Sequence, residues 1–320
     1  MQEKKERKDR PNPMSETSKR GIHIPILRIL RFFLQVLFFV ILNAGLFQLV
    51  SVAFPIPIIP VLSSSGAPGV TAISAFDALQ HSISAVIPLL LLAAVAVFLV
   101  SALLVGKAFC GYVCPFGFAQ DLVAYIRVPL KTKELAMSPK TTKTVLRIKY
   151  YILGVIVILV TVVGAATLAG NRGYALSAIG AFGDMPFSVF SPSDTLFAVI
   201  PELIILQKPL IIGWSLLLWS RMVILVISLG AVILIPRAFC RYICPIAALM
   251  GPLNKYSIVG LERNVVKCKG ERCKKCEKVC PMGVPVFTGP EKRFSKHPQC
   301  ILCLRCKDEC REKAIRFAVP

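Results

Sequence analysis

The sequence predicts an all-α membrane domain of four transmembrane helices, built as two similar hairpins, and a small cysteine-rich domain at the carboxyl end. Three observations lead to this fold class. Apolar residues make up 55% of the 320 residues and the mean hydropathy is +0.69, which is too high for an ordinary soluble domain. A nine-residue phrase with two cysteines occurs twice, and the other eight of the 12 cysteines gather between residues 268 and 310.

Composition divides the chain into three predicted parts. Residues 1–24 form a basic tail that is poor in apolar residues, which is typical of a disordered segment near an anionic lipid surface. Residues 25–256 form the membrane domain, and residues 257–320 form the cysteine-rich domain. We expect no cleavable signal peptide, because the first apolar run is too long and follows a basic segment of 31 residues.

Four apolar stretches are long enough to cross a bilayer, whose hydrocarbon core of roughly 30 Å requires about 20 residues of helix. They cover approximately residues 32–54, 85–105, 150–169 and 210–235. The segments around them contain 9, 0, 8, 2 and 18 Lys and Arg residues in turn, and such cations favour the cytoplasmic side. We therefore predict a multi-pass protein of the inner (cytoplasmic) membrane. Both termini and both cysteine phrases should be cytoplasmic, and the first outer loop should lie along the outer interface.

The repeated phrase reads KAFCGYVCP at residues 107–115 and RAFCRYICP at residues 237–245, each after a long apolar run. Such repetition indicates a duplicated half of the chain. Because a proline follows the second cysteine of each phrase, we interpret Cys114 and Cys244 as N-caps of short helices. A helix N-terminus stabilises a thiolate, which suits a metal ligand or a redox thiol. The alternative, that these are buried cysteines acting as small hydrophobic residues, does not explain the repeated spacing.

We expect the duplication to bring Cys110, Cys114, Cys240 and Cys244 together as one redox site at the inner membrane surface. A disulfide within one phrase needs Cβ atoms about 3.5–4.5 Å apart, whereas i,i+4 positions of a helix lie about 5–6 Å apart. The four thiols are therefore expected to share one iron–sulfur centre or to act as a dithiol/disulfide relay. Lys107 and Arg237 would offset the negative charge and contact anionic lipid or a quinone head group. The alternative is that they are anchors reaching the membrane surface.

The C-terminal domain contains two runs of four cysteines, spaced C-x4-C-x2-C-x3-C-P and C-x2-C-x2-C-x3-C. These runs resemble the bacterial two-cluster ferredoxin module, which implies an α+β fold and two [4Fe-4S] clusters. Carried over from that module, one cluster takes Cys268, Cys273, Cys276 and Cys310, and the other takes Cys300, Cys303, Cys306 and Cys280. The chain departs from the motif by two extra residues after Cys268 and by Arg311 in place of a proline. The alternative is a pair of four-cysteine zinc sites, which normally use two separated CxxC pairs.

The small size of the C-terminal domain, its predicted cytoplasmic location and its charge all agree with bound iron–sulfur clusters. On the predicted cytoplasmic face thiols stay reduced, which favours metal over disulfides. A domain this small needs metal binding to contribute to its folding. From residue 237 onward the chain holds 18 Lys and Arg against 7 Asp and Glu, which suits anionic lipid or an acidic redox partner and gives no indication of nucleic-acid binding. The sequence contains no C-x-x-C-H haem motif and no nucleotide-binding glycine motif.

Taken together, the four spans, the two C-x3-C-P phrases and the two-cluster tail resemble the NapH-type membrane polyferredoxins, which are quinol-dehydrogenase subunits. The same core is similar to that of the NosR/NirI regulators and the CcoG/RdxA assembly proteins. The resemblance implies a membrane-bound protein that relays electrons between the quinone/quinol pool and a redox partner protein. It leaves two alternatives open, a metalloenzyme assembly or metal-reductase factor and a membrane redox regulator.

Overall fold

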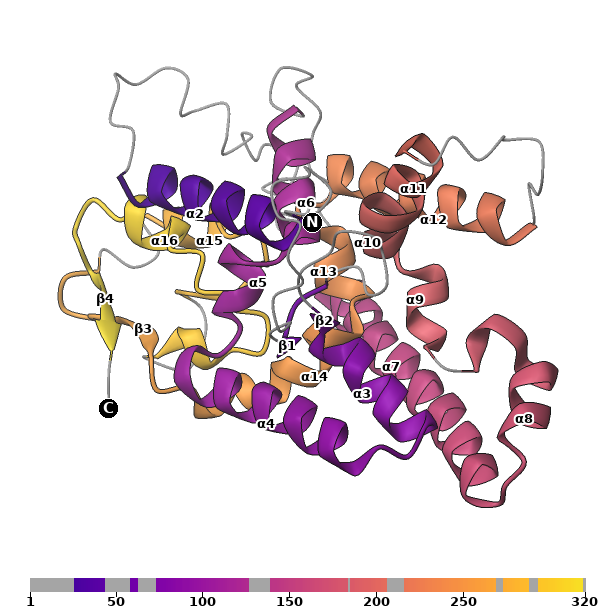
Figure 1. Ribbon diagram of the computed structural model, residues 1–320. Helices are drawn as coiled ribbons and strands as arrows, with labels where there is room; N and C mark the ends of the chain where they lie inside the picture. Colours follow the sequence, from indigo (N-terminus) through magenta and orange to yellow (C-terminus); the bar gives the residue numbers. More distant parts are fainter. Residues whose placement is uncertain are drawn as a thin grey trace.

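A computed structural model describes residues 26–43, 58–62, 73–126, 139–183, 185–205, 216–268, 273–287 and 293–318. The predicted basic tail therefore lies outside the described residues. The described part is mostly helical, and the cysteine-rich domain lies at one side of the molecule, next to α2 and α5 (Figure 1).

Three helices of the described part are long and apolar enough to cross a membrane, namely Pro88–Val105, Thr144–Leu168 and Leu216–Leu234. They correspond to α4 (Pro88–Val105), most of α7 (Pro139–Leu168) and α12 (Leu216–Leu234). These helices match three of the four spans expected from the sequence. Their outer faces are rich in exposed leucine, isoleucine and valine, as expected for helices that face lipid.

The first expected span is different in character. Helix α2 (Ile26–Leu42) has 17 residues, and residues 44–57 lie outside the described part of the chain. The helix is amphipathic, because it buries Arg31 and Gln35 while Phe33 is 60% exposed. A fourth span therefore stays a prediction.

Each cysteine phrase folds in the same way. A five-residue helix, α5 (Ala108–Tyr112) or α13 (Ala238–Tyr242), is followed by a helix that begins at proline, α6 (Pro115–Ile126) or α14 (Pro245–Leu253). The amides of Cys114 and Cys244 each donate a 3.0 Å hydrogen bond to the phenylalanine carbonyl five residues earlier. Cys244 is the N-cap of α14, as predicted, because proline at the first helical position requires no amide partner.

In the first expected outer loop, the described residues 60–62 and 74–76 are buried inside the protein, and the position of the rest of the loop along the outer interface stays a prediction. Strand β1 (Ile58–Ile59) pairs in parallel with β2 (Ile73–Ser74), and the buried side chains of Val61 and Leu62 reach the cysteine phrases. The hydroxyl of Ser193 donates to the carbonyl of Leu62 at 3.3 Å. An apolar loop gains more by burying its side chains than by lying at an interface.

The remaining described elements between the expected spans are short helices. They are α3 (Ala75–Ser84), α8 (Arg172–Ile179), η2 (Gly180–Phe182), α9 (Pro186–Phe190), α10 (Pro192–Asp194), η3 (Thr195–Val199) and α11 (Ile200–Ile205).

The cysteine-rich domain is built on one antiparallel strand pair, β3 (Gly260–Arg263) with β4 (Ile315–Ala318). Its short helices are α15 (Lys275–Lys278), η6 (Phe294–Lys296) and α16 (Arg305–Asp308), and η4 (Asn254–Tyr256) directly precedes the domain. The domain is held directly against the membrane domain, because the amides of Ile258 and Val259 donate to the carbonyls of Leu103 and Leu104 at 2.7 and 3.1 Å.

Candidate metal centres

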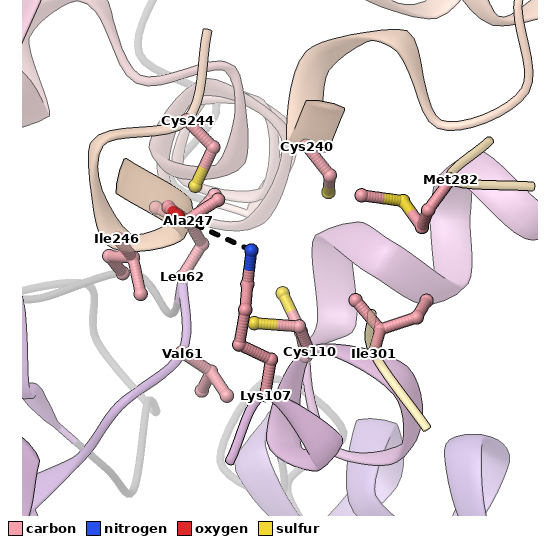
Figure 2. A pocket seen from close by; sticks show the side chains of 11 residues that line it. Val61, Leu62, Lys107, Cys110, Cys240, Cys244, Ile246, Ala247, Met282 and Ile301 are labelled. Carbon is pink, nitrogen blue, oxygen red and sulfur yellow. Dashed lines mark hydrogen bonds between the residues drawn. The ribbon is translucent and has the colours of Figure 1, made fainter. Parts of the chain in front are cut away.

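The four cysteines of the two phrases line one cavity, as the duplication predicted. Cys110 and Cys114 enter it from α5 and the start of α6, and Cys240 and Cys244 enter from α13 and the start of α14. Figure 2 shows the sulfur atoms of Cys110, Cys240 and Cys244 around the ammonium group of Lys107. We call this space the phrase cavity. Four thiols from two related elements are a donor set that suits an iron–sulfur cluster.

Burial is the largest influence on the pKa values of these thiols, and it opposes the thiolate stabilisation expected at a helix N-terminus. Burial, together with the neighbouring cysteines, raises the pKa of Cys114 to about 12. Burial likewise raises the pKa of Cys240 to about 11 and that of Cys244 well above its ordinary value. Without a metal the thiols therefore keep their protons, and a bound cluster would displace them.

Lys107 is fully buried and points into the phrase cavity (Figure 2). Its ammonium group donates to the carbonyl of Ala247 at 3.3 Å and to that of Pro298 at 2.9 Å. Burial lowers the pKa of Lys107, while Cys110, Cys244 and Cys240 counteract this effect. These contacts exclude the alternative that Lys107 is a surface anchor, and they suit a cation that offsets the charge of thiolates.

Arg237 belongs to a buried charge cluster that the sequence analysis missed. The carboxylate of Asp121, on α6, accepts hydrogen bonds from Arg31 and from Arg237, the latter at 2.6 Å. Arg305, between two cysteines of the tail, approaches the same carboxylate at 3.5 Å. Burial alone would raise the pKa of Asp121, but Arg237, Arg31 and Arg305 outweigh it and hold that pKa far below its usual range.

This cluster joins three separate parts of the chain, because Arg31 lies on α2, Arg237 begins the second phrase and Arg305 lies in the tail. Arg237 also donates to the carbonyl of Cys110 at 2.9 Å, and it is only 1% exposed. Burial excludes a surface-anchor role for Arg237 too. The signal in the sequence was the single carboxylate in the apolar helix FGFAQDLVAYI.

A second missed residue is Gln120, which is fully buried beside Asp121. Its side-chain amide donates to the sulfur of Cys240 at 3.0 Å. Since Gln120 follows the first phrase and Cys240 belongs to the second, this bond joins the two halves of the duplication. Hydrogen bonds to cysteine sulfur are one of the means by which proteins tune cluster potentials.

The eight tail cysteines line two further cavities, in the grouping that the ferredoxin resemblance implied. One, the inner tail cavity, is lined by Cys280, Cys300, Cys303 and Cys306. The other, the outer tail cavity, is lined by Cys268, Cys273, Cys276 and Cys310. Among the described residues, no three Cys, His, Asp or Glu side chains converge closely enough for a single metal ion.

The backbone around the tail cysteines repeats and suits an anionic cluster. Lys274 and Leu304, each one residue after a cysteine, have φ of 43° and 60°. Successive amides in such left-handed turns form concave anion-binding nests, which are common at iron–sulfur sites. The amide of Val284 donates to the sulfur of Cys280 at 3.4 Å, and that of Ala314 donates to the sulfur of Cys310 at 3.3 Å. The residues present thus fit a cluster in each tail cavity.

The phrase cavity and the inner tail cavity share walls. Met282 and Ile301 line both. The hydroxyl of Tyr112, in the first phrase, donates to the carbonyl of Leu302 at 3.1 Å. A Cβ atom on Gly111 would lie 2.6 Å from the carbonyl oxygen of Ile301, so glycine permits this close approach. The four phrase cysteines and the four cysteines of the inner tail cavity are therefore neighbours.

Comparison with known proteins agrees with this chemistry. A family model described as "4Fe-4S binding domain" matches residues 86–134 and 217–262, the two segments that contain the cysteine phrases. NapH of Haemophilus influenzae, a ferredoxin-type protein, is 25% identical over 72% of this chain and 68% of its own length. YccM of Escherichia coli K12, whose name assigns it provisionally to electron transport, is 30% identical over 67% of this chain and 51% of its own length.

An uncharacterised protein of Methanocaldococcus jannaschii is 27% identical over 69% of this chain and 68% of its own length. No solved structure matches the chain.

Proposed function

Because this chain is a membrane iron–sulfur electron-transfer protein of the NapH type, we propose that it passes electrons between a membrane quinol and a redox partner protein through three iron–sulfur centres. The quinol follows from the resemblance to quinol-dehydrogenase subunits. The partner is expected to be acidic, because the cysteine-rich domain is strongly basic.

Each centre is assigned to one group of four cysteines. The phrase cavity supplies Cys110, Cys114, Cys240 and Cys244. The inner tail cavity supplies Cys280, Cys300, Cys303 and Cys306, and the outer one supplies Cys268, Cys273, Cys276 and Cys310. The family model supports a cluster at the phrases in particular, since its matched segments contain those cysteines and end before the tail cysteines.

The main support for the proposal is the order of the three cavities, in which the phrase cavity is followed by the inner and then the outer tail cavity. The phrase cavity adjoins helices long enough to cross a membrane, and it shares Met282 and Ile301 with the inner tail cavity. Helices α15 and α16, each within one cysteine run, contact each other and join the two tail cavities. Such a row suits transfer from the membrane to the outer end of the tail.

The proposed electron transfer is balanced in electrons and protons. Oxidation of a quinol to a quinone releases two electrons and two protons. Bound clusters would accept these electrons singly, and the partner protein is the final oxidant. Lys107 and the Asp121 cluster hold positive charge beside the phrase cavity, which stabilises added negative charge there.

The test is a Cys114→Ser, Cys244→Ser double variant in the full chain. We expect its tail clusters to keep their EPR signals after reduction with dithionite, because the tail ligands are unchanged. Reduction of these clusters by a quinol should fall at least tenfold. Quinol-driven reduction at the unmodified rate would refute the path through the phrase cavity. Selective reduction of Cu(II), without reduction by quinol, would favour the metal-reductase alternative instead.

A further inference from the structure

A large apolar cavity lies on the membrane-facing side of the second cysteine phrase. It has a volume of about 720 Å³ and is bounded by α7, α9, α12 and α13. Its walls are aliphatic and aromatic, with Phe182, Phe187, Phe190 and Phe239 among them. Among the described residues, no charged side chain lines it, and the hydroxyl side chains in the lining are those of Tyr151 and Ser228. A mostly apolar space with a few polar groups is typical of a small-molecule site.

This cavity opens at the depth of the proposed membrane spans. Two of its walls, α7 and α12, are helices able to cross a membrane. Tyr151 is 70% exposed and Val155 is 57% exposed along this rim, so a lipid-soluble molecule could enter directly from the bilayer. A water-soluble ligand would find no charged partner among the lining residues.

Helix α13 separates this cavity from the phrase cavity. Phe239 and Ile243 line the apolar side, and each directly precedes a cysteine, Cys240 or Cys244, that lines the other side. The ring of Phe239 also contacts that of Phe116 edge-on, with centroids 5.1 Å apart. A molecule in the apolar cavity would therefore lie one helix away from the four cysteine sulfurs.

We infer that this cavity binds the ring and the first isoprenoid units of a membrane quinone. The inference rests on the proposed function for the class of ligand, and it assigns the site. The aromatic walls suit a flat ring, the open rim suits an isoprenoid chain that continues into lipid, and the hydroxyls of Ser228 and Tyr151 are possible donors to the ring oxygens. Quinone contact with Lys107 or Arg237, expected from the sequence, is not required, because both point into the protein.

The test uses a photoactivatable azidoquinone and the full chain in phospholipid nanodiscs. Mass spectrometry should find the label on peptides of α7, α9 or α12, and unmodified quinone should displace it. Val155→Trp should fill the cavity and reduce labelling at least fivefold. Val162→Trp is the matched control, because Val162 lies two turns further along α7, is 53% exposed and does not line the cavity. This control variant should be labelled to the same extent as the unmodified chain.

The outcomes separate this inference from the proposed function. Label on other segments, labelling that quinone does not displace, or equal labelling of the Val155→Trp and Val162→Trp variants would overturn the site. If the site were wrong but the function right, quinol would still reduce the clusters of the Val155→Trp variant at the normal rate. If labelling follows the cavity while quinol reduces no cluster, the binding site stands and the proposed electron path fails.

Discussion

At the scale of single residues, Asp121 links three parts of the chain, because its carboxylate pairs with the buried Arg31 and Arg237 and with the partly buried Arg305. Asp121→Asn would leave Arg31 and Arg237 buried without a counter-charge. Breaking a buried pair typically costs about 3–5 kcal/mol, so we expect a loss of that size in the free energy of unfolding. Thermal unfolding of the detergent-solubilised chain measures it.

The matched control for this prediction is Glu262→Gln. Glu262 pairs with Arg316 at 2.5 Å, but the two side chains are 30% and 65% exposed. An exposed pair is worth about 0–1 kcal/mol. Equal destabilisation by both substitutions would show that burial of the Asp121 cluster has no special importance.

Cys280 tests the grouping of the tail cysteines. It follows Cys276 along the chain, yet it lines the cavity of Cys300, Cys303 and Cys306. Cys280→Ser should therefore damage the inner tail cluster and leave the outer one intact, as counted by EPR of the reduced protein. Cys310→Ser is the reciprocal control and should damage the outer one. Loss of the opposite cluster in either variant would contradict the crossed assignment.

At the scale of elements, the first phrase and the tail are in direct contact at Gly111. A Cβ atom there would lie 2.6 Å from the backbone oxygen of Ile301, so Gly111→Ala must move helix α5 or the tail. Such overpacking typically costs about 1–3 kcal/mol. We expect lower stability and weaker magnetic coupling between the phrase and inner tail clusters. Gly154→Ala in α7, where a Cβ atom would meet nothing within 4 Å in the described part of the chain, is the control and should preserve both.

The helices and loops also show which structural features can be predicted from the sequence. Local patterns correctly predicted three of the four expected spans and the N-cap at Cys244, because helix length, hydropathy and proline position are encoded in neighbouring residues. The inward fold of Val61 and Leu62 was not predictable, since it depends on packing between distant segments. The same holds for Asp121, whose arginine partners are 90, 116 and 184 residues away. A lone carboxylate in an apolar helix indicates a buried partner but does not identify it.

At the scale of the whole molecule, polar contacts around the phrase cavity join the two duplicated halves to each other and to the tail. Lys107 reaches Ala247 and Pro298, Gln120 reaches Cys240, and Asn254 donates to the carbonyls of Ser295 and His297 at 2.8 and 2.9 Å. The tail is thus fixed to the membrane domain by polar contacts beside the proposed centres. A fixed arrangement keeps neighbouring centres at constant separation, which a flexible tail would not.

The orientation of this assembly in the membrane follows from the distribution of cations. The 9, 0, 8, 2 and 18 Lys and Arg of successive segments favour cytoplasmic termini, and a reducing compartment for the cysteines requires the same orientation. Reporter fusions after residues 60, 135, 185 and 320 should therefore read outside, inside, outside and inside. The fusion after residue 60 is the most informative, because Val61 and Leu62 reach the phrase cavity although they follow the first expected span. An inside reading there would mean that α2 does not cross the membrane. An outside reading at residue 320 would place the tail cysteines in the oxidising compartment and contradict the proposed electron path.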